Sequence, residues 1–148
     1  MKKKLVIEII AFVFIVLFLY ASVSKILDYQ KFKVQIGQSP LLTGFGGIIP
    51  WLVIVVELLI AALIMIPRFR LFAFFCSFSL MVMFTAYIIA ILNFSSYVPC
   101  SCGGILEKLT WRDHLIFNCL FVVLALVAIV LQAEENSGYP EETQHVTL

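Results

Sequence analysis

Charged side chains are scarce in this sequence. Only 13% of its 148 residues are Asp, Glu, Lys or Arg, about half of the roughly 25% that is usual in soluble domains. Its seven glycines are too few for a collagen-like repeat. The formal net charge is +1, and no basic block is large enough to bind a nucleic-acid backbone. Four cysteines are too few for a disulfide-dense scaffold, but they are enough for a redox or metal site.

Hydrophobic residues are abundant instead. They make up 63% of the chain, against about 45–50% in average proteins, and the mean hydropathy is +1.10. A small soluble core cannot bury this much apolar surface, because the surface-to-volume ratio at this length leaves a large area exposed. The same composition excludes a disordered chain. We therefore expect lipid to be the solvent of a single domain.

Four apolar runs are long enough to cross a membrane, which takes about 17–25 residues. Hydrocarbon offers the backbone no hydrogen-bond partners, so each run is expected to be a helix. The predicted fold class is an all-α membrane protein, a four-transmembrane-helix bundle formed by residues 1–132. The predicted spans cover residues 5–23, 48–66, 71–92 and 115–131.

Two further segments flank these spans. Between the first and second, Tyr29, Phe32 and Ile36 recur at helical spacing and predict a short amphipathic helix lying in the interface. After the fourth, residues 133–148 are rich in glutamate and are expected to form a disordered acidic tail. The first run, preceded by three lysines, could also be a cleaved signal peptide. Its length exceeds the usual apolar core of about 7–15 residues and favours a retained helix.

The orientation of the bundle follows from its basic residues. Four spans place the N-terminus, the turn with Arg68 and Arg70, and the C-terminal tail on one side. Each side carries five basic residues, so counting them gives a tie. The clustering of the lysines at positions 2–4 and of the arginine pair favours this side as cytoplasmic. The third connection, residues 93–114, is then extracytoplasmic.

This third connection contains the motif Pro99-Cys100-Ser101-Cys102-Gly103-Gly104. Two cysteines one residue apart can approach the Cα separation of about 4.4–6.8 Å that a disulfide needs. The small ring would be strained, and a strained, exposed disulfide exchanges readily, which favours a redox role. An incidental disulfide or two packed thiols remain alternatives. A soft metal such as Cu(I), held by both thiolates, is a third.

Two ionisable residues are the other candidates for the site. Glu57 lies well inside the second run, where a carboxylate costs roughly 2.5–3.5 kcal/mol. Its side chain should therefore face the bundle interior. There it could donate or accept a proton, or orient the cysteine loop through a hydrogen bond. Alternatively, it could form a polar contact that holds two helices together. His114 lies where the loop enters the fourth run, on one helical face with Asn118, and would favour a thiolate. Alternatively, His114 belongs to an interfacial belt anchored by Trp111.

Three more residues carry weaker signals. Lys25 follows the first run, on the membrane face of the cysteine loop, and could pair with Asp28 or with a partner. Cys119 could be a second relay thiol, although a lone cysteine in an apolar helix is more often a small hydrophobic residue. Cys76 lies near the start of the third run, at the opposite membrane face, and should not reach the cysteine loop.

Together these features resemble the DoxX-like superfamily and, more closely, the MauE family of redox-associated membrane proteins of methylamine utilisation. The resemblance implies a bacterial plasma-membrane protein that helps form or shuffle disulfides in an exported dehydrogenase subunit, a role that falls on Cys100 and Cys102. It rests on the order of the four spans and on these residues: Lys25, Asp28, Glu57, the Cys100-Ser101-Cys102 loop, Trp111, His114 and Asn118.

The sequence thus predicts thiol–disulfide exchange with an extracytoplasmic client or a thioredoxin-like partner. No cofactor is implied directly. A quinone is suggested only by analogy with quinone-linked disulfide-forming enzymes, which use a Cys-x-x-Cys pair. One rival hypothesis is a non-catalytic subunit of a larger membrane complex, docked through the Tyr29, Phe32 and Ile36 stripe. Another is a soft-metal handling protein with Cys100, Cys102 and His114 as ligands.

Overall fold

The computed structural model describes residues 2–38, 43–94 and 110–138. Within these ranges the chain forms helices joined by short turns, and it contains no strand. The all-helical prediction is therefore confirmed. The helices are α1 (Lys2–Leu27), α2 (Tyr29–Gln38), α3 (Ile49–Met65), α4 (Arg70–Phe94) and α5 (Trp111–Ser137), with short 3-10 helices η1 (Thr43–Phe45) and η2 (Pro67–Phe69).

Three of the helices, α1, α4 and α5, are long and apolar enough to cross a membrane. The fourth apolar helix, α3, is shorter, with 17 residues. Large apolar side chains cover the outside of the bundle, for example Phe12, 66% exposed, and Leu120, 64% exposed. Such a continuous apolar exterior is unusual for a protein in water. The chain is a membrane protein.

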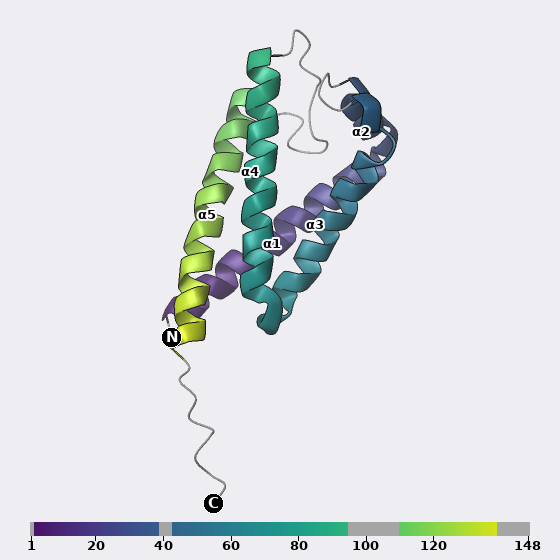
Figure 1. Ribbon diagram of the computed structural model, residues 1–148. Helices are drawn as coiled ribbons and strands as arrows, with labels where there is room; N and C mark the ends of the chain where they lie inside the picture. The colour runs from purple at the N-terminus through teal and green to yellow at the C-terminus, as the bar shows by residue number, and fades with distance from the viewer. Residues whose placement is uncertain (1, 39–42, 95–109, 139–148) are drawn as a thin grey trace, which may run out of the picture.

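The long helices form two antiparallel pairs that cross at an angle (Figure 1). One pair is α4 with α5 and the other is α1 with α3, and each pair is packed closely along its length. The N-terminus, η2 and the end of α5 lie at one end of the bundle. The end of α1, α2, the start of α3 and the start of α5 lie toward the opposite end. The described ends of the helices therefore alternate between the two ends of the bundle, in the order that the sequence predicted.

Aromatic packing joins the two pairs at the centre of the bundle. Phe14 of α1 is completely buried. Its ring lies 6.4 Å from that of Phe74 on α4 and 5.4 Å from that of Phe121 on α5, both in edge-on geometry. Ala73 and Ala125 are also fully buried, and small side chains of this kind let membrane helices approach closely.

Within the described part of the chain, ion pairs join the helices at the end with the N-terminus. Arg70 contacts Glu8 at 2.6 Å, Lys3 contacts Glu134 at 2.6 Å, and Lys4 contacts Glu135 at 3.2 Å. The two glutamates of α5 belong to the acidic segment that the sequence placed in a tail beginning at residue 133. The helix instead continues to Ser137, and the lysines of α1 lie opposite these carboxylates. Residues 139–148 lie outside the described part of the chain.

The predicted amphipathic helix is present as α2, and its apolar stripe packs on the bundle. Phe32 and Ile36 are buried. The ring of Tyr29 lies 5.1 Å from that of Trp51 on α3. These side chains contact the chain's own helices, so the stripe is not the free surface that the partner-docking hypothesis requires.

Replacing Phe14 by alanine should destabilise the bundle strongly. The substitution leaves a void between α1, α4 and α5, and losses of this kind cost about 3 kcal/mol or more. Phe12→Ala, on the exposed face of the same helix, is the matched control and should change the midpoint of thermal unfolding very little. The measurement is thermal unfolding of both purified variants in the same detergent. Equal losses of stability would contradict the assignment of Phe14 to the core.

Candidate functional site

A buried ion pair joins the end of α1 to the middle of α3. The Nζ of Lys25 lies 2.8 Å from Oε1 of Glu57, and the Oγ of Ser22 donates a hydrogen bond to Oε2 at 3.2 Å. The side chains of Lys25 and Glu57 are only 7% and 1% exposed. Residues three apart share a helix face, so Ser22 and Lys25 present two donors to the two oxygens of one carboxylate.

The surroundings of Lys25 compensate its charge further. Its ammonium group also donates a longer hydrogen bond, of 3.4 Å, to the carbonyl of Ala21. It lies 5.8 Å from the ring centre of Phe32 and 6.0 Å from that of Phe84. Rings at this distance attract a cation through their electron-rich faces. A charge that is costly in a lipid environment thus has an anion, a carbonyl and two aromatic rings around it.

The sequence predicted that Glu57 faces the bundle interior, and this is confirmed. The suggested pairing of Lys25 with Asp28 is not what the structure shows, because the ammonium group contacts Glu57 instead. The predicted first span ended at residue 23, which placed Lys25 in the interface, away from the carboxylate. The helix continues to Leu27, so Lys25 belongs to α1, and its long side chain reaches Glu57. Ser22, three residues earlier, was missed as a second donor.

The first turn of α5 holds the other polar residues of the site. Thr110 caps this helix: its Oγ1 accepts a hydrogen bond from the backbone N–H of Asp113 at 3.3 Å. His114 and Asn118 follow one turn apart and are both buried, 7% and 3% exposed, so their predicted common face is confirmed. Arg112 and Asp113 are exposed. The alternative that put His114 in the lipid headgroups therefore fits these two neighbours but not the histidine.

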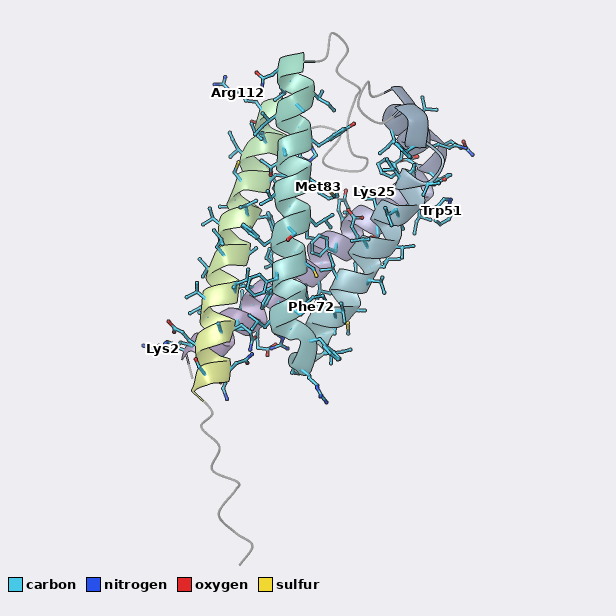
Figure 2. The ribbon with its side chains drawn as sticks, viewed as in Figure 1. Lys2, Lys25, Trp51, Phe72, Met83 and Arg112 are labelled. Carbon is cyan, nitrogen blue, oxygen red and sulfur yellow. The ribbon has the colours of Figure 1, made fainter. Side chains whose placement is uncertain are left out.

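The buried polar groups of α1, α3 and α5 meet at one cavity of about 340 Å³, which is lined by side chains from all five helices. Its polar lining includes Lys25, Glu57, His114 and Asn118, and most of the remaining lining is apolar. Lys25 and Met83, which both line it, lie in the region between α3 and α4 (Figure 2). The structure thus brings together two predicted site residues, Glu57 and His114, from helices that are distant in sequence.

The two remaining predicted site residues, Cys100 and Cys102, lie outside the described residues. The described helices nearest to them in sequence, α4 and α5, end at Phe94 and begin at Trp111. Cys119 is exposed on α5 and does not line the cavity, so the structure gives no support to a relay through it. Residues 2–38, 43–94 and 110–138 contain no cluster of three metal-ligating side chains.

Breaking the Lys25–Glu57 pair from one side should be more harmful than removing both charges. Lys25→Met or Glu57→Leu alone leaves an uncompensated buried charge, at a cost of about 3–5 kcal/mol. The double variant should recover most of this loss, because two apolar side chains of similar size can replace a buried pair. Thermal unfolding of the four proteins in one detergent measures the cycle. Additive losses would show that the two charges are not coupled.

Comparison with known proteins agrees with the resemblance inferred from the sequence. The model of the family described as methylamine utilisation protein MauE matches residues 3–131, which include all of α2, α3 and α4 and most of α1 and α5. Searches among curated proteins and among solved structures gave no match. The family match covers well over half of the chain and includes Lys25, Glu57, His114 and the Cys100-Ser101-Cys102 motif. This membrane protein therefore belongs to the MauE family.

Proposed function

We propose that this chain is a four-span plasma-membrane protein that assists the formation or exchange of disulfides in an exported protein through Cys100 and Cys102. Its family is described by a role in methylamine utilisation. The observation that supports a site next to the cysteine motif is the position of His114. This imidazole lies in the first turn of α5, which follows the motif in sequence, and it lines the cavity that contains Lys25 and Glu57.

The proposed reaction is thiol–disulfide exchange. A thiolate of the client attacks one sulfur of the Cys100–Cys102 disulfide, whose S–S bond breaks as a mixed disulfide forms. The second client thiolate then attacks the client sulfur of that mixed disulfide and releases the cysteine. Two electrons and two protons pass from the client dithiol to the cysteine pair. Isomerisation of a client disulfide begins with the reverse attack, in which a thiolate of the reduced Cys100/Cys102 pair attacks the disulfide of the client.

His114 and Glu57 have different proposed roles. An imidazole exchanges protons near neutral pH, so His114 is proposed to accept and return the proton of the attacking thiol. Glu57 has both carboxylate oxygens engaged, one by Lys25 and one by Ser22. These contacts support a positioning role, in which Glu57 holds α1 against α3 beside the cavity.

In the proposed four-span topology the cysteine motif lies outside the cytoplasm. In this arrangement α3 is the second span, and the end of the bundle with the N-terminus, Arg68 and Arg70 faces the cytoplasm. The basic residues at that end support this orientation. An extracytoplasmic motif meets an oxidising compartment, in which disulfides form and persist.

The exchange hypothesis predicts that Cys100→Ser traps a client. In Cys100→Ser the remaining Cys102 can attack a client disulfide and form a mixed disulfide, and in the reverse variant Cys102→Ser the remaining Cys100 can do the same. Each variant lacks the second cysteine that would attack this mixed disulfide and reduce the client. One of the two should give a thiol-sensitive, higher-mass species on non-reducing gels of cell membranes. Cys119→Ser, which leaves the motif intact, is the matched control and should give none. Differential alkylation with mass spectrometry should show that the wild-type pair changes reversibly between thiol and disulfide.

Other alkylation results would support the rival hypotheses. A permanently oxidised pair, with no trapped species, would favour a non-catalytic subunit of a larger complex. Thiols that react only after a metal chelator is added would favour soft-metal handling.

The topology predicts which cysteines a membrane-impermeant maleimide reaches in intact cells. In a chain whose other cysteines are replaced by serine, Cys100 should be labelled from outside. A cysteine placed in η2 by Arg68→Cys, in a cysteine-free background, should be labelled only after the membrane is permeabilised. The reverse pattern would place the motif in the cytoplasm and contradict the proposed function.

A further inference from the structure

The cavity described above contains a polar group without a partner. The Nδ2 of Asn118 is buried and has no hydrogen-bond partner among the described residues, although its side chain lines the cavity. A buried donor without an acceptor is destabilising, because it has lost its hydrogen bonds to water and gained none in return. An acceptor atom supplied by a bound molecule would satisfy it.

The charges around the cavity favour an uncharged molecule. The ammonium group of Lys25 and the carboxylate of Glu57 also line it and neutralise each other at 2.8 Å. The two carboxylate oxygens are engaged by Lys25 and Ser22. An anionic ligand would bring a second negative charge next to Glu57 in a medium of low polarity, at a large cost. A neutral acceptor, such as a carbonyl oxygen, brings no such cost.

The rest of the lining suits an apolar body. Aromatic rings from four helices contribute to it, those of Phe18, Phe32, Phe84 and Phe117 among them. The volume of about 340 Å³ lies within the range of roughly 300–1,000 Å³ of small-molecule sites, which combine apolar walls with a few placed polar groups.

We propose that this cavity binds the carbonyl-bearing end of a neutral, apolar molecule from the bilayer, with the Asn118 amide donating to the carbonyl oxygen. Two classes of membrane molecule carry this chemistry: isoprenoid quinones and the ester carbonyls of neutral lipids. The proposal does not depend on the function assigned to Cys100 and Cys102, since neither cysteine takes part in the binding.

The test compares three probes on protein reconstituted in nanodiscs. Decylubiquinone carries ring carbonyls, dioctanoylglycerol carries ester carbonyls, and decylbenzene has a comparable apolar body without an acceptor. At least one carbonyl probe should bind more tightly than decylbenzene and raise the thermal unfolding midpoint with concentration. Which one binds identifies the source. If neither carbonyl probe exceeds decylbenzene, the proposal is wrong.

Two substitutions on α5 assign the contact. Asn118→Leu should weaken binding of the carbonyl probe about tenfold, the effect of losing one buried hydrogen bond, and should leave decylbenzene unaffected. Gln132→Leu is the matched control, since Gln132 is a buried amide on the same helix, with an unpartnered Oε1, that does not line the cavity. It should leave the affinity unchanged. Equal losses in the two variants would overturn the assignment.

Two readouts separate binding from folding and from the cysteine chemistry. In the absence of probe, Asn118→Leu should unfold at no lower temperature than the wild type, because Nδ2 has no partner to lose. A variant with both Cys100→Ser and Cys102→Ser should bind the probe as the wild type does. Loss of binding in that variant would show that the site depends on the cysteines and would contradict the proposal.

Discussion

The attraction between Lys25 and Glu57 is the constraint on which the organisation of this bundle depends. An isolated charge in a lipid environment is expensive, and each of these residues has its counter-charge on another helix. The pair therefore fixes which face of α1 meets α3. At the opposite end of the bundle, Lys3 and Glu134 are both well exposed, and pairs of that kind contribute little to stability.

The cavity lies where four polar side chains, those of Lys25, Glu57, His114 and Asn118, meet an otherwise mostly apolar lining. Nearer the N-terminus of α1, Phe14 is fully buried and its ring packs edge-on against those of Phe74 and Phe121. Toward the end with α2, buried polar groups join the aromatic rings, and side chains from all five helices line the cavity between them. One sequence thus supports an aromatic centre, at which the two helix pairs pack together, and a cavity with polar groups toward the end with α2.

The sequence was sufficient for those features that follow from solvent and periodicity alone. The long apolar runs predicted helices, and the charge of Glu57 within the second run predicted that its side chain is buried. The four-residue spacing of His114 and Asn118 predicted that they share one helix face. It was insufficient where long-range contacts decide. The partner of Lys25 depends on how far α1 continues and how far its side chain reaches. The acidic residues after residue 132 read as a tail, yet α5 extends through Glu134 opposite Lys3.

The length of α3 has a consequence for the membrane itself. Its 17 residues extend about 25 Å, at 1.5 Å per residue, whereas the hydrocarbon layer is about 30 Å thick. In the four-span arrangement the surrounding lipids must compress along this side, since a span that is too short thins the bilayer next to it. Hydrophobic mismatch would then bring headgroups and water closer to Glu57 than they come to residues at the same level of α4, and the protein would favour thinner membrane regions.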